Sequence, residues 1–564
     1  MAIRARLAAP APVEREAHAS LSPQWSALPM RLLQAGDRRM EAETYLSSGY
    51  GLRLALEERT AGWVPLSQLA KVWQPLRLKG TLVPKGVGTP FLTATQVFDV
   101  RPVPRKWLAI EKTSKASDRF LKPGTIVVTC SGAVGRATLA YDAHAGTLVS
   151  HDLLRVAPHV AEQRGWIYAY LRSPQARAMM NGAQYGHIIK HLETSHLDAL
   201  PVPVVRNDIA ADFQKQVDTI LELRNLAHKL SLDAESLFSD FIGPIQVTDT
   251  ETGYTISASK MYERRRRFEA NYHAPIASAI LRRFAEIGAT TMPLSEVAER
   301  VWWMTRFRRF YGDAGIPYLS ADELFTTNGA ESKKILVENG DGHEDFYCEE
   351  GWIVMACSGQ VYGLNGASTL ITAHHERTFF SHDLIRIVAK RGEILPGYLL
   401  TTLSHPALGR PLLMRAAYGT SIPHLDPNDV AAFPIVRLGQ RRELQISLLA
   451  QGAADARAEA DALERKIATD AGILIDKFLS GDSQSFVMTT QRQSNQAAKV
   501  ASSTLQEHAR VRLLRRVGHQ PKGSVGAIIH IYSDTSGLEV EFVKVHGIPD
   551  VVTVNAKDVD LLND

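Results

Sequence analysis

The feature that most constrains this chain is an internal duplication. Five short motifs from its first half return in the same order in its second half, at a nearly constant separation. The matching segments are residues 39–42 and 267–270, 65–67 and 293–295, 125–132 and 352–359, 150–155 and 381–386, and 185–186 and 418–419. This order indicates a tandem copy of one unit of about 210 residues, spanning roughly 28–241 and 256–478. A period this long indicates duplicated domains and not a solenoid.

Each copy begins with a mixed, strand-rich part. Runs of β-branched and apolar residues that end at a Ser-Gly turn predict strands at 125–129 and 353–356. Short helices are predicted at 165–172 and 396–403, because a proline follows each segment. The fold class expected from these patterns is α+β, with the mixed domain present twice.

Each copy ends in a long helix with a regular apolar seam, whose positions alternate in steps of three and four. The seam positions are Ile220, Leu223, Ala227, Leu230, Ala234, Leu237 and Phe241 in the first copy, and Ile446, Leu449, Ala453, Ala456, Ala460, Leu463, Ile467, Ala471, Leu474 and Phe478 in the second. This heptad spacing predicts two coiled-coil helices that pack on each other. A helix of about 30 residues is about 45 Å long. An antiparallel pair therefore predicts a dumbbell with the mixed domains at opposite ends.

The ends of the chain lie outside the duplication. Alternating apolar runs after a Ser/Gln-rich stretch predict a small C-terminal β-barrel of the SH3-like kind. From residue 523 onward that part holds seven acidic and two basic residues, a poor phosphate-binding face. The expected boundaries are 1–27 for an N-terminal arm, 28–210 and 256–440 for the mixed domains, 211–255 for the first long helix with its connector, 441–482 for the second, 483–515 for a linker, and 516–564 for the barrel.

Composition limits where the protein acts and what it contacts. The chain has 564 residues, with 64 basic and 60 acidic side chains and a formal net charge of +4, so any nucleic-acid contact must come from local clusters. No apolar run approaches the ~20 residues that span a bilayer, so no membrane association is expected. The N-terminal residues do not form a secretory signal. Three cysteines are too few for a disulfide framework and fit a reducing cytoplasm.

Three weak motifs, repeated in order with a long helix each time, carry a family resemblance. They are the Cys-Ser-Gly-Ala-Val-Gly turn at 130–135, the Gly-Thr-Ser-Ile-Pro-His-Leu stretch at 419–425, and Leu-Pro-Val-Pro at 200–203. In them the chain resembles the DNA-specificity subunit of type I restriction–modification systems, over roughly residues 28–480. The first copy departs from the family pattern at 186–191, where its loop is bulkier and basic.

The resemblance implies a non-catalytic subunit of an antiviral restriction system. Each copy would be a target recognition domain that reads one half of a bipartite site in double-stranded DNA. The helices would fix the gap and dock two adenine-N6 DNA methyltransferase subunits, and a restriction/translocase subunit would then join. S-adenosylmethionine, ATP and Mg²⁺ would bind to these partners, with no cofactor or metal in this chain. Three alternatives stay open: a specificity subunit for a fused methyltransferase–nuclease, a standalone DNA-acting enzyme, and a duplicated scaffold.

The candidate DNA-binding residues come from polar and basic positions beside turns. The most basic and aromatic stretch is 301–311, whose arginines could hold phosphates or reach guanine edges. The alternatives are a solvated face for the basic stretches, a turn that caps the next segment for the Tyr-Gly loops, and hairpin chemistry for the residues after the Ser-Gly turn. The full candidate set is Arg77, Lys79, Lys85, Arg136, Tyr185, His187, Lys190, Arg306, Arg308, Arg309, Tyr362, Asn365, Tyr418, Thr420 and Ser421.

Several enzyme motifs are discounted. Gly-x-Ser-x-Gly, a P-loop and an Asn/Asp-Pro-Pro-Tyr motif are missing from the sequence. The Ser-His-Asp triplets at 150–152 and 381–383 are sequence-adjacent residues of a strand, which point to opposite faces and cannot form one triad. Asp461, Glu464 and Lys466 resemble a nuclease set, but they lie on the predicted long helix. They are expected to be solvated helix charges.

Overall fold

A computed structural model describes residues 41–561, with gaps at 78–79, 111–115, 187–189, 248–252, 263–266, 328–332, 338–343, 489–509, 518–519, 532–536, 546–547 and 556–557. The expected N-terminal arm and most of the expected linker therefore lie outside the described residues. The chain divides into two compact units. The first holds the described residues up to Glu58 together with Val64–Phe486, and the second holds Arg59–Trp63 and the described part of Val487–Asp564.

The two copies in the first unit share one sheet topology. Each contains a four-stranded antiparallel sheet in which the strand after the Ser-His-Asp triplet lies at an inner position. In the first copy the order is β2 (Ala70–Trp73), β9 (Leu153–Pro158), β6 (Ile126–Thr129), β7 (Ala137–Leu139). In the second copy it is β12 (Ala298–Trp303), β18 (Leu384–Ala389), β15 (Ile353–Ala356), β16 (Ser368–Leu370). The internal duplication is confirmed, as are the strands predicted before each Ser-Gly turn.

Each copy also carries a smaller sheet with one parallel pair. In the first copy the order is β3 (Leu82–Val83), β5 (Lys106–Leu108), β4 (Thr89–Leu92), β8 (Leu148–Val149). In the second it is β14 (Lys333–Leu336), β13 (Phe310–Leu319), β17 (Phe379–Phe380). The parallel pairs are β4 with β8 and β13 with β17. This sheet holds the loops that differ most between the copies.

Short helices attach each mixed domain to a long helix. The predicted helices are present as α4 (Arg164–Arg172) and α12 (Pro396–Ser404). Both touch their long helix through a glycine: a Cβ at Gly165 would lie 2.2 Å from the backbone nitrogen of Gln214, and one at Gly397 would lie 2.3 Å from the carbonyl oxygen of Ser447. No larger residue fits such a close backbone approach.

The remaining short elements of the first unit also come largely in pairs. They are α2 (Ala42–Leu46), α3 (Ser48–Glu57), β1 (Trp63–Pro65), α5 (Pro174–Ala183), α6 (Thr194–Asp198) and β10 (Pro201–Pro203) in the first copy, and α8 (Ala258–Tyr262), α9 (Pro275–Glu286), β11 (Thr291–Pro293), α10 (Leu294–Val297), α11 (Ala321–Leu324), α13 (Gly409–Met414), α14 (Pro427–Ala431) and β19 (Pro434–Val436) in the second.

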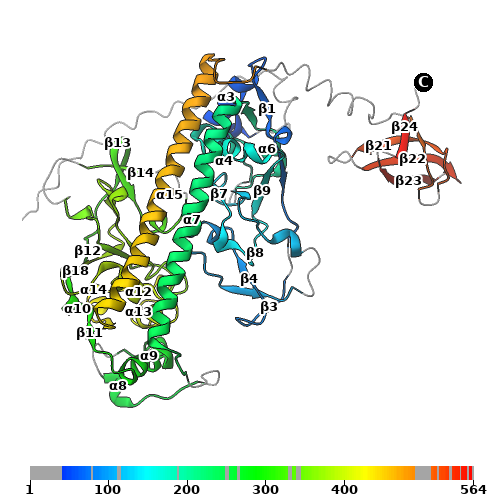
Figure 1. Ribbon diagram of the computed structural model, residues 1–564. Helices are drawn as coiled ribbons and strands as arrows, with labels where there is room; N and C mark the ends of the chain where they lie inside the picture. The colour runs from blue at the N-terminus through cyan, green and yellow to red at the C-terminus, as the bar shows by residue number, and fades with distance from the viewer. Residues whose placement is uncertain are drawn as a thin grey trace, which may run out of the picture. The chain divides into compact units, whose positions relative to one another are not determined.

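The two long helices run side by side and antiparallel (Figure 1). They are α7 (Asn207–Ile242), with 36 residues, and α15 (Gln440–Ser480), with 41. The direction follows from contacts at both ends, because the C-terminal end of α7 packs with the N-terminal half of α15 in one core. At the other end, the backbone N–H of Arg206 donates to the carbonyl oxygen of Ser485 at 3.1 Å. At ~1.5 Å per residue the helices are about 54 and 62 Å long.

The buried face of α7 differs from the predicted seam at several positions. Ile220, Ala227 and Ala234 are buried as expected, but Arg224 and Phe238 take the places predicted for their neighbours. Leu223, Leu230, Leu237 and Phe241 are only partly buried. In α15 most of the predicted positions are buried, with Leu449, Leu463 and Leu474 partly so. The seam shifts by one residue because α7 packs against α4 as well as α15, so its buried face is wider than a two-helix seam.

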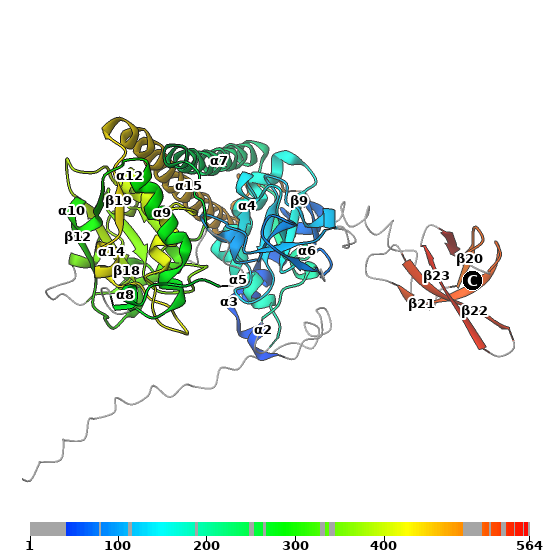
Figure 2. The ribbon, with the colours of Figure 1, turned by 90° about the horizontal axis from the view of Figure 1, so that it is seen from below.

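The mixed domains attach near opposite ends of the helix pair, as expected, since α4 packs at Gln214 of α7 and α12 packs at Ser447 of α15. The expectation that they sit apart, as in a dumbbell, is wrong. They meet directly: the backbone N–H of Val100 donates to the carbonyl oxygen of Phe325 at 2.9 Å, and that of Thr327 donates to Phe98 at 2.6 Å. Figure 2 shows both copies beside the helix pair, with α4 of the first and α12 of the second against it. The cause is that the loops after β4 and β13 reach beyond their own sheets to the other copy. We call this contact the inter-repeat junction.

The second unit contains a five-stranded antiparallel sheet around a small apolar core. The strand order is β23 (Ile548–Asn555), β22 (Gly537–Val545), β21 (Val525–Ile531), β20 (Arg510–Leu513), β24 (Val559–Leu561). Strand β20 lies within the segment expected to be linker, and it adds Arg510 and Arg512 to the sheet. The acidic excess counted from residue 523 onward therefore does not describe the whole sheet. Among the described residues, no helix combines the length and apolar character needed to cross a membrane.

Candidate nucleic-acid interface

In both copies, a side-chain hydrogen bond ties the Ser-Gly turn to the Tyr-Gly loop. Ser131 Oγ lies 3.2 Å from His191 Nδ1, and Ser358 Oγ lies 2.8 Å from His424 Nδ1. Backbone bonds reinforce this contact, since the N–H of Gly132 donates to Lys190 at 3.1 Å. Sequence analysis treated the turn and the loop as separate candidates. The structure joins them into one surface in each copy, at equivalent positions.

The same loops carry an aromatic pair that repeats with the same geometry. The rings of Tyr185 and His191 are 5.8 Å apart with an interplanar angle of 39°, and those of Tyr418 and His424 are 6.1 Å apart at 39°. Each tyrosine also exchanges two backbone hydrogen bonds with its histidine. The histidine is thus held by a tyrosine on one side and a serine on the other. We infer that this histidine fixes the position of the Tyr-Gly loop.

In the second copy, most candidate residues of these loops face solvent. Tyr418, Thr420 and Ser421 are exposed, and Tyr362 is 64% exposed. Asn365 is different, because it is fully buried and its Nδ2 donates to the carbonyl oxygen of Pro423 at 2.9 Å. The structure therefore assigns Asn365 to holding the loop and corrects its prediction as a DNA contact.

In the first copy, the corresponding side chains are engaged within the domain. Tyr185 donates from its hydroxyl to Glu193 at 2.6 Å, and this hydrogen bond raises the pKa of Tyr185 to about 12. Lys190 Nζ donates to Glu43 at 2.8 Å. Both side chains are half-buried, while His187 lies outside the described residues. The two copies thus hold the loop in the same way but expose different side chains on it.

The basic-aromatic stretch forms an exposed connection between β12 and β13. Arg306, Arg308 and Arg309 are all exposed. Below them, Phe307 packs against an apolar cluster that contains Phe346 and Phe379. The other aromatic side chains do not all pack under the loop, because Trp303, Phe310 and Tyr311 are 39%, 46% and 51% exposed. Three cations beside exposed rings make this the strongest candidate surface for phosphates and bases.

The corresponding region of the first copy is less basic. Arg77 is exposed, and the ammonium group of Lys85 lies 6.0 Å from the ring centre of Trp107. Lys79 lies outside the described residues. The two copies therefore differ in exposed positive charge at this position.

Arg136 occupies the inter-repeat junction. Its Nη2 donates to the carbonyl oxygen of Thr327 at 3.4 Å, and its guanidinium lies 4.5 Å from the ring centre of Phe98. Burial, and then the positive charges of Arg177 and Arg172, lower the pKa of Arg136 to about 10. Neither of its sequence interpretations foresaw this, since it joins the first copy to the second.

Sequence analysis missed several functional candidates at this junction. The guanidinium of Arg105 lies 5.7 Å from the ring of Tyr362 in the other copy, and Arg105 also pairs with Asp99 at 4.0 Å. Arg177 and Arg465 line a cavity beside Arg136. None of these residues belongs to a repeated motif, so the sequence offered no signal beyond their charge.

The Ser-His-Asp triplets serve the frame of each domain, but they do not lie within a strand as predicted, since β9 and β18 begin at the next residue. Ser150 Oγ donates to Asp152 at 2.8 Å and does not contact His151, so no histidine activates that serine. The arginine that ends the motif is fully buried in both copies: Arg155 donates to the carbonyl oxygen of Ser150, and Arg386 to that of Leu384. Within the described residues, no group of three His, Cys, Asp or Glu side chains is placed to hold a metal ion.

The expectation that the acidic residues of the second long helix are solvated is wrong for Glu464. Its side chain is 2% exposed, and it accepts hydrogen bonds from Arg224 at 2.9 Å and from the Tyr168 hydroxyl at 2.9 Å. Asp461 also pairs with Arg224, while Lys466 remains exposed. These charges form an ion cluster between the long helices and α4, with no nuclease geometry.

Comparisons with known proteins gave matches only among solved structures. No protein-family model matches the chain, and no curated protein matches it. The S subunit of a type I restriction–modification system from M. genitalium is 15% identical, with 77% of this chain and 98% of that chain covered and a TM-score of 0.28. The HsdS subunit from Thermoanaerobacter tengcongensis is 12% identical, with 74% and 96% covered and a TM-score of 0.22. A structure described as the basis of complex assembly and conformational transition of the type I R-M system is 12% identical. It covers 74% of this chain and 97% of its own, with a TM-score of 0.22. These three solved structures come from type I restriction–modification systems, and two of them are the S or HsdS subunit.

Proposed function

We propose that this chain is the non-catalytic DNA-recognition subunit of a type I restriction–modification complex. One observation carries the proposal: the two copies keep the same frame and differ where they are exposed. Ser131 with His191 and Ser358 with His424 hold equivalent loops, while the exposed side chains on those loops and on the smaller sheets are different. This is the arrangement that a bipartite DNA site requires, with one reader for each half.

The remaining architecture supports a spacing and docking role. The antiparallel helix pair would act as a coiled-coil ruler between the half-sites and as the platform for two adenine-N6 methyltransferase subunits and a restriction/translocase subunit. S-adenosylmethionine, ATP and Mg²⁺ would bind to those partners, and the assembly would act in the cytoplasm in antiviral defence. The C-terminal sheet, as an SH3-like barrel, would contact a protein partner and not DNA.

The first test is DNA binding by the purified chain and its assembly. Because phosphate contacts release counterions, affinity should fall by ~10³–10⁵ between 50 and 200 mM salt if 6–10 phosphates are held. Methylome sequencing of cells with and without the chain should show a two-part methylated motif that depends on it. Binding that is insensitive to salt, or an unchanged methylome, would contradict the proposal.

A double substitution tests whether the two copies read independently. Arg306→Ala with Arg308→Ala removes two exposed cations from the second copy, and exposed positions usually change the free energy of unfolding by less than ~0.5 kcal/mol. Loss of a base-reading arginine costs ~1–3 kcal/mol of discrimination, so one half-site should lose its sequence preference. Arg282→Ala with Arg391→Ala, which removes two exposed cations elsewhere in the same copy, is the charge-matched control. Equal loss at both half-sites, with the fold intact, would refute modular reading.

A further inference from the structure

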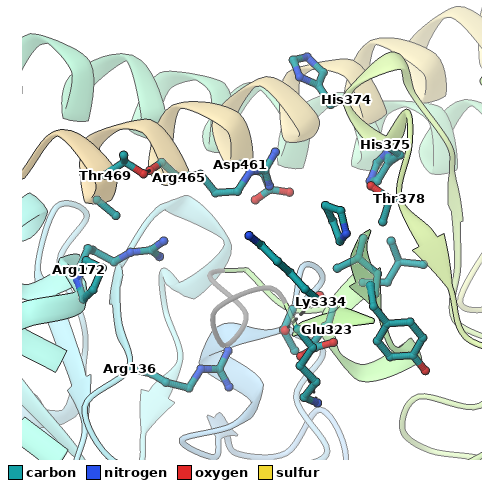
Figure 3. A pocket seen from close by; sticks show the side chains of 18 of the residues that line it. Arg136, Arg172, Glu323, Lys334, His374, His375, Thr378, Asp461, Arg465 and Thr469 are labelled. Carbon is teal, nitrogen blue, oxygen red and sulfur yellow. Dashed lines mark hydrogen bonds and ion pairs between the residues drawn. The ribbon is translucent and has the colours of Figure 1, made fainter. Parts of the chain in front are cut away.

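A large cavity lies between the two copies and the second long helix. Its volume is about 1160 Å³, and it is lined by α4, α5 and the Ser-Gly turn of the first copy, β13 and β14 of the second, and one face of α15. Figure 3 shows Arg136 and Arg172 at one side, Asp461, Arg465 and Thr469 on the helix, and Lys334 and Glu323 from the second copy. Small-molecule sites are typically ~300–1,000 Å³. The cavity is therefore large enough for a molecule of nucleotide size.

The cavity lining has an excess of positive charge. Six cations line it, against three carboxylates, which leaves an excess of three with the histidines neutral. The cations are Arg136, Arg172, Arg177, Lys333, Lys334 and Arg465. Two of the three carboxylates already have cationic partners: Glu323 pairs with Lys333 at 3.3 Å, and Asp461 pairs with Arg224 at 2.5 Å. The lining itself therefore holds more cations than carboxylates.

The arginines at one side of the cavity repel each other, because their positive charges lie close together. The pKa of Arg136 is lowered to about 10 by burial and by its neighbours Arg177 and Arg172. Arg172 Nη1 is buried and makes no hydrogen bond to the described residues, and its nearest paired carboxylate oxygen, on Glu464, is 3.8 Å away. Partly desolvated cations are stabilised by an anion that accepts their hydrogen bonds.

We propose that this cavity binds a small polyphosphate ligand, either free or as part of a nucleotide. Guanidinium groups bind phosphate oxygens in a bidentate manner, and the cavity offers three from the first copy and one from α15. Hydroxyl groups of Thr378 and Thr469 line the same space and can donate to further oxygens. A ligand held here would bridge the two copies and the helix pair. The lining includes Tyr311 and the end of the Ser-Gly turn, which border the surfaces assigned to DNA, so the experiment includes a duplex that separates the two uses.

Isothermal titration calorimetry of the full chain tests the site, with sodium triphosphate, ATP without Mg²⁺ and sodium sulfate at one ionic strength. The test variant is Lys334→Gln with Arg465→Gln, because both side chains are exposed and come from different sides of the cavity. The matched control is Lys229→Gln with Arg441→Gln, two exposed cations of the long helices that are not among the cavity-lining residues. Thermal melting checks that every variant is folded.

Triphosphate should bind the wild-type chain, and the test variant should weaken its binding at least ~10-fold, since each substitution removes a donor of charge-assisted hydrogen bonds. The control should bind as the wild type does. Tighter binding of ATP than of triphosphate identifies a nucleotide, and equal binding identifies the phosphate chain. No binding, equal weakening in the control, or a preference for sulfate overturns the proposal. A duplex that displaces triphosphate and needs the same two residues also overturns it, because the cations would then belong to the DNA path.

Discussion

One carboxyl group at the inter-repeat junction makes the contact between the copies sensitive to pH. Asp99 forms a bridge opposite Thr326, and burial raises its pKa to about 7, with Arg105 and Arg136 partly opposing the shift. An unfolded aspartate titrates near ~3.9, so the folded chain binds more protons between about pH 4 and 7. Stability contributed by the protonated group is fully present below the unfolded pKa and is lost as the pH rises through the folded pKa.

We therefore expect the wild-type chain to lose stability between about pH 4 and 7 relative to Asp99→Asn, which stays neutral throughout. Urea unfolding at several pH values measures this directly, and hydrogen exchange at the amides of Val100 and Thr327 reports on the junction itself. Asp118→Asn, an exposed aspartate of the same copy, is the control. Parallel pH profiles for the wild type and Asp99→Asn would show that the carboxylate is solvated in the folded state.

At the scale of single residues, the sequence predicted where the loops are but not which side chains they expose. The Ser-Gly turns and Tyr-Gly loops were both predicted, because glycine, proline and small polar residues mark them locally. The burial of Asn365 depends on the carbonyl of Pro423, which is 58 residues away. The position of Arg136 depends on Thr327, 191 residues away. Such contacts arise only from tertiary structure, so spacing alone could not separate contact residues from structural ones.

Between the long helices, a buried ion cluster fixes how the helices align. Burial would lower the pKa of Arg224, but Asp461 and Glu464 outweigh that effect and the pKa is raised. Arg224 is 5% and Glu464 is 2% exposed, and the cluster sits among small apolar positions. A shift of one helix along the other by a heptad would leave these charges buried without partners, which is strongly unfavourable. The apolar seam by itself tolerates such a shift, because its positions repeat.

We expect Arg224→Met to lower the free energy of unfolding by about 3–5 kcal/mol, because it leaves Glu464 buried without its main partner. Adding Glu464→Met should recover much of this loss, since methionine matches the buried, apolar surroundings. Lys466→Met, at an exposed position of the same helix, serves as the control and should change little. Urea unfolding measures all three variants. A loss for Arg224→Met no larger than the control would mean that the cluster is hydrated.

The helix pair can be tested as a ruler by lengthening both helices at the same level. Leu230 of α7 faces Gly452 of α15, so one heptad inserted after each of these residues should preserve the pairing. Seven residues add about 10.5 Å, which corresponds to about three base pairs of DNA. The preferred gap in a series of duplexes with different spacers should grow by that amount. An insertion in α7 alone would misalign Arg224 and should unfold the pair. An unchanged gap in a folded double insertion would assign the spacing to the inter-repeat junction instead.

The sequence predicted the long helices because their periodicity extends over many turns, whereas their antiparallel direction was assumed and does not follow from that pattern. It misplaced part of the seam of α7, since packing against α4 widens the buried face and brings Arg224 into it. It also missed that the Asp461 and Glu464 charges are buried. A charged residue on a predicted helix is expected to be solvent-exposed unless an oppositely charged partner is known. Here that partner lies on the other long helix. Periodicity therefore predicts that a helix forms, but packing against a further helix, here α4, decides which of its faces is buried.

At the scale of the whole molecule, the duplication was the most reliable prediction, because two copies test each other. Equivalent strand orders in the four-stranded sheets follow from motifs that recur in order. The contact between the copies could not be predicted in this way, since it involves loops near Asp99 and Thr326 that the copies do not share as a motif. The cavity could not be predicted for the same reason, because residues of both copies line it. Features that arise between repeats are thus less visible in a sequence than features that arise within them.

The first unit extends beyond the end of α15. Residues after α15 still belong to the first unit: Phe486 packs on Phe478 with ring centres 4.9 Å apart, and it bridges to Val205 at the start of α7. A chain cut after Met488 keeps these contacts, whereas one cut after Asp482 loses them. Phe478 is 1% exposed in the intact chain, so the shorter form should expose it and lose roughly 1–3 kcal/mol of unfolding free energy.

We expect the chain cut after Met488 to bind site-specific DNA as the intact chain does, because the five-stranded sheet lies outside both copies and the helix pair. Competition between specific and non-specific duplexes measures sequence discrimination, and urea unfolding compares the two truncated forms. The form cut after Asp482 shows what the loss of Phe486 does to stability and binding. A binding defect that both forms share therefore has another cause, because the longer form keeps Phe486. If the longer form is folded and binds DNA but no longer discriminates between sequences, the C-terminal sheet takes part in recognition. In that case the basic strand β20, with Arg510 and Arg512, is the first place to look for the contact.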